Sequence, residues 1–180
     1  FLTFDDSAHI PIATLPGMKD RTITISSTGK TFGVTGWKIG WAMATPKLSH
    51  AIRMVHQFNT FCVNHPLQMA MAESLIELDH YLISFKKSYL EKRNLFCKGL
   101  TDLGFMVTKP LGTYFIMCPI SNKTDLTDVD YCMELIKTKK VATIPPSSFY
   151  LKSDQGQDYL RFCFAKKDST LNAALKNLQA

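Results

Sequence analysis

Apolar positions in the first half of the chain follow patterns typical of short strands alternating with helices. Arg21–Ser26 alternates β-branched and polar residues, which predicts a strand, whereas Ser26–Trp37 is rich in Ser, Thr and Gly, which favour turns. Lys38–Ala44 is apolar and predicts a buried strand. Thr45-Pro46 and Asn64-His65-Pro66 are helix-start signals. The helix expected after Thr45-Pro46 carries Leu48, Ala51, Ile52 and Val55 on one face. The helix expected after Asn64-His65-Pro66 covers Leu67–Leu78.

The second half begins with a long helix, which is followed by short strands and two shorter helices. A helix is expected over His80–Leu103, and Gly104 is a suitable residue to end it. Thr127 and Asp130 form a capping pattern for a helix over Thr127–Lys139, and a last helix begins at about Asp168. The apolar faces expected for these three helices are Tyr81, Phe85, Tyr89, Phe96 and Leu100; Val129, Cys132, Met133 and Ile136; and Leu171, Ala174, Leu175 and Leu178. Strands are expected at Phe1–Phe4, Phe105–Thr108, Thr113–Cys118, Val141–Ile144 and Tyr159–Phe164.

These elements predict an α/β protein in three parts. Residues 1–79 would be part of an α/β domain, residues 80–103 a connecting helix, and residues 104–180 a small α+β domain. The chain opens with Phe1 inside an apparent strand and has no initiator Met, so we expect a piece of a longer protein or a processed product.

Composition excludes several classes of protein. The chain has 180 residues, of which 46% are hydrophobic and 20% charged, as in a globular protein rather than a disordered chain or a small disulfide scaffold. No apolar run approaches the ~18 residues that a membrane helix needs, so no membrane association is expected. The net charge is +6, but the lysines occur in scattered pairs such as Lys86-Lys87 and Lys139-Lys140. This spacing favours solvated helix faces over a nucleic-acid surface.

The cysteines and histidines indicate neither disulfides nor a metal site. Five cysteines are widely spaced, in apolar surroundings and without a CxxC pair, which favours buried free thiols in a reducing, cytoplasmic compartment. His50 and His56 lie six residues apart and therefore do not share a helical face as metal ligands would.

The stretch Ser26–Trp41 carries the candidate chemistry. A strand ends there in a turn with hydroxyls, backbone donors, Lys30 and Lys38, and no acidic residue occurs from Arg21 to Lys38. Such a turn suits an anion, for example the phosphate of a ligand. It is not a nucleotide-binding P-loop, because the first glycine of that motif is missing. Lys30 is a candidate nucleophile if desolvation or a second cation lowers its pKa, although an ordinary surface turn remains the alternative.

The residues of this stretch match a known pattern, Ser-x-x-Lys-Thr-Phe-x-x-Thr-Gly-Trp-Lys-x-Gly-Trp. It resembles the cofactor-lysine segment of class I pyridoxal-phosphate aminotransferases, in particular the kynurenine, glutamine and methionine aminotransferase subgroup. The resemblance covers essentially the whole chain. It continues through Val55-His56-Gln57, Phe61, Pro66-Leu67-Gln68, Gly112-Thr113-Tyr114-Phe115, Ala142-x-Ile144-Pro145 and Leu160–Leu171.

The resemblance implies a role for each matching residue. Lys30 would bond to the aldehyde of pyridoxal 5'-phosphate and later move a proton between the substrate Cα and the cofactor, as general base and acid. Ser27 and Lys38 would bind the cofactor phosphate. Arg161 would pair with the substrate α-carboxylate through its planar guanidinium. On an alternating strand its side chain should point away from the apolar neighbours Leu160 and Phe162.

Two further residues would contact the substrate. Phe61 would line the side-chain pocket of its own or of a partner subunit, and the Cys at position 62, where some relatives have His, argues against a kynurenine preference. Tyr114 would be part of the core or of the pocket. The family's carboxylate for the pyridine nitrogen and its tyrosine ligand fall just before Phe1, and neither Asp5 nor Asp6 occupies that place in the motif.

The resemblance therefore predicts the C-terminal half of an aminotransferase, from inside the large cofactor-binding domain to the end of the small α+β domain. The whole enzyme would transfer an amino group from an L-amino acid of methionine, glutamine or aromatic type to a 2-oxo acid, as a homodimer. The isolated half is expected to be inactive. Two alternatives are a cysteine-conjugate β-lyase on the same scaffold and a non-catalytic aminotransferase-like binding module; retention of Lys30 argues against the latter.

Overall fold

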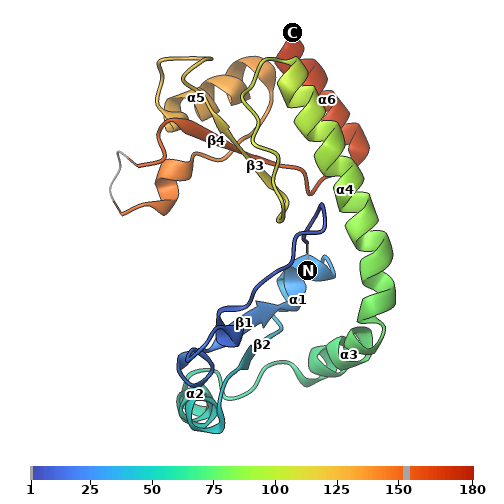
Figure 1. Cartoon of the computed structure of the whole chain (residues 1–180), viewed down its shortest axis with the longest axis vertical. Coiled ribbons are helices and arrows are strands. Elements are labelled where there is room, and N and C mark those ends of the chain that lie inside the picture. The colour runs from blue at the N-terminus through green and yellow to red at the C-terminus, as the bar shows by residue number, and fades with distance from the viewer. Residues whose placement is uncertain (1, 152–154) are drawn as a thin grey trace. The chain divides into compact units, whose positions relative to one another are not determined.

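The computed structural model describes residues 2–151 and 155–180, which form two compact units (Figure 1). Unit 1 consists of Ala8–Ile83, and unit 2 consists of Leu2–Ser7 together with Ser84–Ala180. Helix α4 (Leu78–Asp102) begins in unit 1 and ends in unit 2, and the chain also passes between the units at Ser7–Ala8. The division into domains at residues 79 and 103 stays a prediction.

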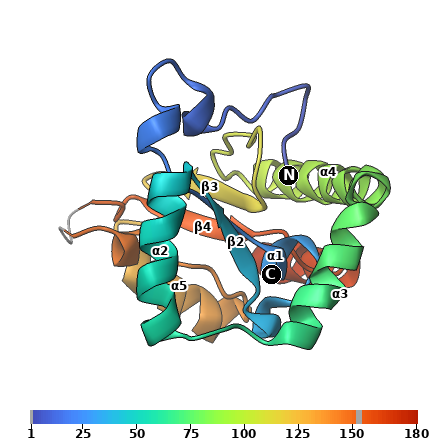
Figure 2. The ribbon, with the colours of Figure 1, turned by 90° about the horizontal axis from the view of Figure 1, so that it is seen from below.

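Unit 1 is built around a two-stranded antiparallel ribbon. Ser27 is paired with Gly40 at one end of this ribbon and Thr24 with Met43 at the other. Helix α2 lies alongside it (Figure 2), and a hollow of about 520 Å³ between them is lined by Trp41, Ile52 and others. The elements of unit 1 are η1 (Ile12–Thr14), η2 (Lys19–Arg21), β1 (Thr24–Ser27), α1 (Thr28–Thr31), η3 (Thr35–Trp37), β2 (Gly40–Met43), α2 (Pro46–Asn59) and α3 (His65–Ile76).

Both strands of unit 1 are where the sequence predicts them, but the expected burial of the second strand is wrong. Only Ile39, just before β2, is buried, whereas Met43 is exposed and Ile25 on β1 is 78% exposed. Within the described residues no further strand joins this ribbon, so the side chains of both strands remain largely accessible. The apolar sequence of β2 thus identifies the strand without identifying what covers it.

The helix-start signals of unit 1 are confirmed. Thr45 is the N-cap of α2 and Pro46 its first residue, although the Thr45 side chain makes no capping hydrogen bond. Asn64 caps α3 through its side-chain oxygen, which accepts from the backbone N of Leu67 at 3.1 Å. No residue of α2 is buried, so its expected apolar face is at best partly covered.

Helix α4 agrees closely with its predicted range and face. Phe96 and Leu100 are buried, and Tyr81, Phe85 and Tyr89 are partly buried. The helix ends as expected before Gly104, which adopts a left-handed φ of 80°. Two side chains from a later loop satisfy carbonyls at this end, because Lys123 Nζ donates to Leu103 O at 2.7 Å and Asn122 Nδ2 to Gly104 O at 2.9 Å.

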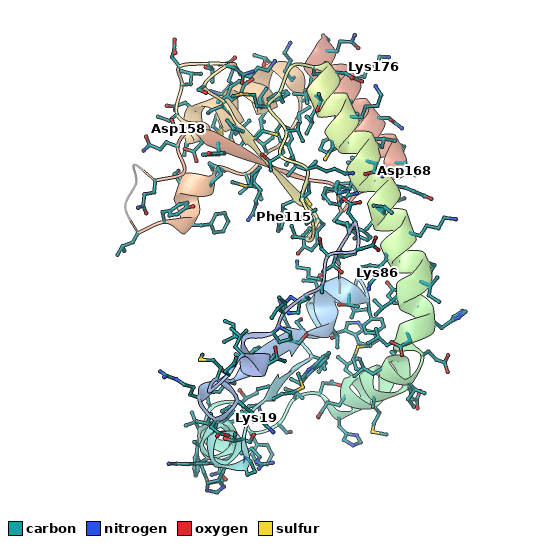
Figure 3. All side chains as sticks on the ribbon, in the orientation of Figure 1. Lys19, Lys86, Phe115, Asp158, Asp168 and Lys176 are labelled. Carbon is teal, nitrogen blue, oxygen red and sulfur yellow. The ribbon has the colours of Figure 1, made fainter. Side chains whose placement is uncertain are left out.

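Unit 2 packs helices around a second antiparallel pair of strands. The core consists of side chains from α4, both strands and α6, including Phe96, Ile116, Leu160, Phe162 and Leu171. Figure 3 labels Asp168 and Lys176 near the two ends of α6 and Phe115 at the start of β3. The elements of unit 2 after α4 are β3 (Phe115–Pro119), α5 (Asp128–Glu134), the π-helix η4 (Leu135–Lys139), η5 (Pro146–Phe149), β4 (Tyr159–Cys163) and α6 (Asp168–Gln179).

Three strand predictions in unit 2 are wrong. Phe105–Thr108 and Val141–Ile144 form no strand, and Ile144 makes only an isolated bridge to Arg161. At the start of the chain, Phe1 lies outside the described residues, and Thr3 makes a single bridge to Gly112. Apolar alternation identifies residues that face the core here, but too few backbone partners are available to form a ladder.

The apolar face predicted for the helix Thr127–Lys139 is confirmed for Cys132 and wrong for its other three residues. Thr127 caps it as expected, accepting from Asp130 N at 3.3 Å. However, Val129, Met133 and Ile136 are exposed, whereas Asp128, Tyr131, Cys132 and Leu135 are buried at spacings of three and four residues. The buried face is therefore displaced by one residue from the predicted face and includes the carboxylate of Asp128. A pattern of apolar residues alone does not predict a buried carboxylate.

Among the described residues, no helix is long and apolar enough to cross a membrane. The same residues contain no group of three His, Cys, Asp or Glu side chains that could hold a metal ion. All five cysteines are free; Cys97, Cys118 and Cys132 are buried as expected, Cys163 is partly buried, and Cys62 is exposed, contrary to expectation. Cys62 follows the end of α2 in a segment that packs against no core.

Candidate functional site

Lys30 lies on a single helical turn held at the end of β1. Ser27 is the N-cap of α1, and its Oγ accepts a hydrogen bond from Gly29 N at 3.1 Å. Thr28 is buried, and its N and Oγ1 both donate to Ile39 O, at 3.1 and 2.8 Å. Lys30 itself is exposed. The turn is therefore fixed by its buried Thr, while the lysine amine remains accessible within this chain.

Lys38 occupies a left-handed backbone conformation just before β2. Its φ is 58°, which is uncommon for a residue other than Gly and often marks a functional site. Two residues later, Gly40 pairs with Ser27, and a Cβ at Gly40 would lie 2.5 Å from the carbonyl oxygen of Ser26. Only glycine permits this close approach of the two strands. The ribbon thereby fixes both ends of the segment that carries Lys30 and Lys38.

Tyr81 braces the Lys30 turn from helix α4. Its hydroxyl donates to Thr31 O at 2.7 Å, and its ring stacks on Phe32 at a centroid distance of 5.3 Å. Burial raises the pKa of Tyr81, so the phenol stays protonated and remains a donor. The sequence pattern assigned Tyr81 to an apolar helix face and gave no sign of this hydroxyl contact.

Phe61 follows the end of α2 and is 80% exposed. Its φ is 68°, and its N donates to His56 O at 2.9 Å. A bulky side chain in the left-handed region is strained, which commonly occurs where a side chain must be presented in a particular direction. Ser27, Lys30, Lys38 and Phe61 all belong to unit 1.

Arg161 belongs to unit 2 and lies between Leu160 and Phe162 on β4. Both neighbours are buried in the core, so the prediction that Arg161 points to the opposite face is confirmed. It is not simply solvated, because its guanidinium carbon lies 4.3 Å from the ring centre of Phe115 and 4.6 Å from that of Phe149. These distances are typical of cation–π contacts.

Within the residues that the structure describes, Arg161 has a buried donor without a protein partner. Its Nε is buried and unpaired, and within the described residues no carboxylate forms an ion pair with it. A buried donor without a hydrogen-bond partner destabilises the folded protein. Its presence here therefore indicates that a ligand accepts this hydrogen bond. A carboxylate is the ligand whose geometry fits the planar fork of arginine.

Tyr114, the other residue predicted for unit 2, packs against the hydrophobic core. Its carbonyl oxygen accepts from Phe164 N at 3.0 Å. The next residue, Phe115, is the first residue of β3, and its ring contacts the Arg161 guanidinium. The contacts of Phe115 and Phe149 with Arg161 were not predicted from the sequence, although Phe115 lies in the Gly112–Phe115 motif. A substrate contact by Tyr114 stays a prediction.

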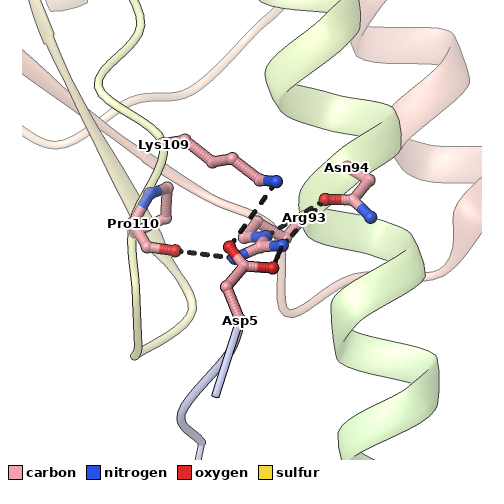
Figure 4. Close-up of polar contacts among 5 residues, drawn as sticks. All are labelled: Asp5, Arg93, Asn94, Lys109 and Pro110. Atoms are coloured by element: carbon pink, nitrogen blue, oxygen red, sulfur yellow. Dashed lines mark hydrogen bonds and ion pairs between the residues drawn. The ribbon is translucent and has the colours of Figure 1, made fainter. Parts of the chain in front are cut away.

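Asp5, near the start of the chain, forms an ion pair within unit 2. Asp5 binds Arg93 through both carboxylate oxygens and also lies 3.5 Å from Lys109 Nζ (Figure 4). The Arg93 hydrogen bond holds the pKa of Asp5 below its usual range. This agrees with the inference that Asp5 does not serve the pyridine nitrogen of a cofactor.

Comparison with known proteins identifies the family. The sequence pattern of the family "Aminotransferase class I and II" matches residues 2–178. Methionine aminotransferase of Escherichia coli is 37% identical, and a kynurenine–oxoglutarate transaminase of Dictyostelium discoideum 38% identical; each comparison covers 99% of this chain. The chain spans only 46% of the length of either relative.

Solved structures give the same result. A crystal structure of the Escherichia coli protein identified as a methionine aminotransferase matches with a TM-score of 0.91 over 99% of this chain and 46% of that one. N-Succinyldiaminopimelate aminotransferase from Mycobacterium tuberculosis matches with a TM-score of 0.92 at 36% identity, with the same coverage. The fold is that of the mixed α/β aminotransferases. The chain belongs to the class I and II aminotransferase family, whose members depend on pyridoxal phosphate.

Proposed function

We propose that this chain is the C-terminal half of an aminotransferase that moves an amino group from an L-amino acid to a 2-oxo acid. The Lys30 turn carries this proposal. It presents an exposed amine in a segment bounded by Ser27 and Lys38, and no acidic residue occurs between Asp20 and Glu73. The set of donors, one amine for an aldehyde and a hydroxyl and ammonium for a phosphate, fits pyridoxal 5'-phosphate.

Within this proposal, unit 1 holds the cofactor. Ser27 Oγ and Lys38 Nζ would bind its phosphate, and Lys30 Nζ would hold it covalently. When bound, the cofactor supplies an electron sink for negative charge at the substrate Cα. Lys30, once released by the incoming substrate amine, would move a proton from the substrate Cα to C4′ of the cofactor, and in the opposite direction in the second half of the reaction.

Unit 2 would contribute recognition of the substrate carboxylate through Arg161, whose buried Nε lacks a partner among the described residues. Phe61 would line the pocket for the substrate side chain, and Tyr114 would contact the substrate. An apolar pocket suits substrates of methionine, glutamine or aromatic type. Two of the relatives bear the names methionine aminotransferase and kynurenine–oxoglutarate transaminase, which supports the same range.

We also propose a homodimer in a reducing, cytoplasmic compartment, with residues 1–79 as part of the large domain and 104–180 as the small domain. The five free cysteines support the compartment. Sedimentation of the full-length protein that contains this chain tests the dimer, and a monomer that retains full activity contradicts it.

The decisive experiment is covalent trapping of the cofactor. The full-length protein is loaded with pyridoxal 5'-phosphate, reduced with borohydride and digested, and the modified peptide is mapped. We expect modification at Lys30; modification at Lys38 or Lys47 instead would refute the assignment. Product analysis then defines the reaction. A new amino acid formed from an added 2-oxo acid supports transamination, whereas pyruvate and ammonia from a cysteine conjugate would indicate a β-lyase.

A further inference from the structure

The two rings that contact Arg161 come from elements of very different rigidity. Phe115 belongs to β3, where it is paired with Cys163 of β4, so the ladder fixes its position. Phe149 is the last residue of η5, a short 3₁₀ turn outside any sheet, and is 65% exposed. Contact between Phe149 and the Arg161 guanidinium therefore requires something else to hold η5 in place.

Asp128 on α5 holds that turn. Its Oδ2 accepts from Ser147 N at 2.8 Å, and its Oδ1 accepts from Ser147 Oγ at 3.0 Å. The Oδ1 atom also accepts from Val129 N at 2.9 Å. Asp128 is fully buried, and no cation is paired with it among the described residues. These three hydrogen bonds thus compensate for the loss of hydration of the buried carboxylate.

Burying an ionised carboxylate is expensive even when hydrogen bonds satisfy it. A turn that served only to connect Ile144 with β4 would not need such a group, because apolar packing would hold it at lower cost. The buried carboxylate instead fixes the backbone two residues before Phe149. Asp128 thus accepts a hydrogen bond from Ser147 in the η5 turn, and Phe149 of the same turn contacts the Arg161 guanidinium.

We propose that Asp128, Ser147 and Phe149, together with Phe115, are positioning residues for Arg161; we call these four residues the Arg161 brace. Their function is to orient the guanidinium for a substrate carboxylate. Aromatic rings take up the π-face of a guanidinium, whereas its N–H donors point outward in the plane of the group. The brace thus selects a ligand that approaches in that plane and accepts two hydrogen bonds, which describes an α-carboxylate. This inference rests on the proposed carboxylate role of Arg161.

The test compares three substitutions of Phe149 in the full-length holoenzyme. Phe149→Ala removes the ring, Phe149→Leu keeps apolar volume without a π-face, and Phe149→Tyr keeps the ring. We expect Phe149→Ala and Phe149→Leu to raise KM for both the amino acid and the oxo acid about tenfold, with kcat changed less, and Phe149→Tyr to restore the wild-type value. Leu151→Ala, at a fully exposed neighbour, is the matched control and should leave KM unchanged.

A double-mutant cycle tests the connection to Asp128. We expect Asp128→Asn and Ser147→Ala to raise KM in the same direction as Phe149→Ala. Because they act through the ring, Asp128→Asn should add little in the Phe149→Ala background. Additive effects, or a wild-type KM in Asp128→Asn, would overturn the role of Asp128. A Phe149→Leu enzyme with wild-type KM would overturn the brace.

A binding measurement separates this inference from the proposed function. Calorimetric titration of the cofactor-free full-length protein with butyrate reports carboxylate binding without turnover. If Arg161→Lys and wild type bind butyrate equally, the carboxylate role of Arg161 fails and the inference falls with it. If Arg161→Lys weakens binding and Phe149→Leu does not, the carboxylate role stands and the brace alone is refuted.

Discussion

The carboxylate of Asp5 and the guanidinium of Arg93 form a bidentate ion pair, although the two residues lie 88 positions apart in the sequence (Figure 4). Nη1 donates to Oδ2 at 2.7 Å and Nη2 to Oδ1 at 2.9 Å. Arg93 is fully buried, donates also to Pro110 O at 3.0 Å, and lies 4.6 Å from the ring centre of Phe4. This pair joins the segment Leu2–Ser7 to unit 2.

The pair makes the stability of unit 2 depend on pH in the acidic range. The Arg93 hydrogen bond lowers the pKa of Asp5 from 3.8, so the stabilisation is fully present above that value. It is lost as pH falls through the lowered pKa of the folded state, because protonated Asp5 no longer pairs with Arg93. Thermal unfolding of the chain from about pH 6 to pH 2.5 measures this loss. Asp5→Asn should remove this component of the pH dependence, and the exposed neighbour variant Asp6→Asn should retain it.

Replacing Lys38 should weaken the cofactor phosphate specifically. We expect Lys38→Gln to raise the Kd of the full-length protein for pyridoxal 5'-phosphate by about 10- to 100-fold, as for loss of a hydrogen bond to a charged group. The Kd for pyridoxal, which lacks the phosphate, should change little. Lys47→Gln, at the start of α2, is the matched lysine control. Equal weakening of both ligands by Lys38→Gln would show that Lys38 supports the loop rather than the phosphate.

The two units should differ in local stability within this chain. Of the buried hydrophobic side chains in the described residues, only Ile39 and Met71 belong to unit 1. Opening of unit 1 therefore exposes little apolar surface and costs less free energy. We expect backbone amides of β1 and β2 to exchange with solvent deuterium well before those of β3 and β4. Equal protection of the two ribbons would contradict this expectation.

Thiol reactivity should follow burial. Burial raises the pKa of Cys118 to about 12 and also raises the pKa values of Cys97 and Cys132. Few thiolates form at these positions at about pH 8, and reagents cannot reach them. A disulfide reagent should therefore modify exposed Cys62 first and the three buried thiols only on unfolding. A Cys62→Ser chain that still reacts rapidly at Cys118 would contradict the packing of unit 2.

Raised thiol pKa values also predict the alkaline limit of stability. A folded-state pKa above the unfolded value of 9.0 means that the folded chain retains protons that the unfolded chain releases. Stability is therefore unaffected below about pH 9 and falls as pH rises toward 12. Cys118→Ala should show a shallower decrease in Tm across that range. An unchanged slope would place the alkaline transition elsewhere, for example at buried Tyr131, whose pKa is also raised.

Local sequence signals predicted much of the fold. Pro46, Asn64 and Gly104 act through their own backbone or side-chain chemistry, so the helix boundaries that they indicate are confirmed. The prediction that β2 is buried was wrong. An apolar strand sequence indicates that other residues must cover the strand, but it does not indicate which segment supplies them. Likewise, apolar alternation at Val141–Ile144 did not indicate that only one residue finds a backbone partner.

For the site, the family resemblance predicted roles for Lys30 and Arg161 but did not indicate the residues that contact them. Tyr81 and Phe149 were missed because their role depends on contacts between segments far apart in sequence. Asp128 was missed for a different reason. A carboxylate on the inner face of α5 violates the apolar pattern by which that face was predicted, and its buried position becomes evident only with Ser147 beside it.

The β1–β2 ribbon has a practical consequence for handling this chain. Within the described residues it has no third strand, so each outer edge offers unpaired amides and carbonyls beside accessible Ile25 and Met43 side chains. Such an edge is a template for strand addition between molecules. Overproduced without the remainder of an aminotransferase, the chain should accumulate in inclusion bodies, with intermolecular β-pairing seeded at this ribbon.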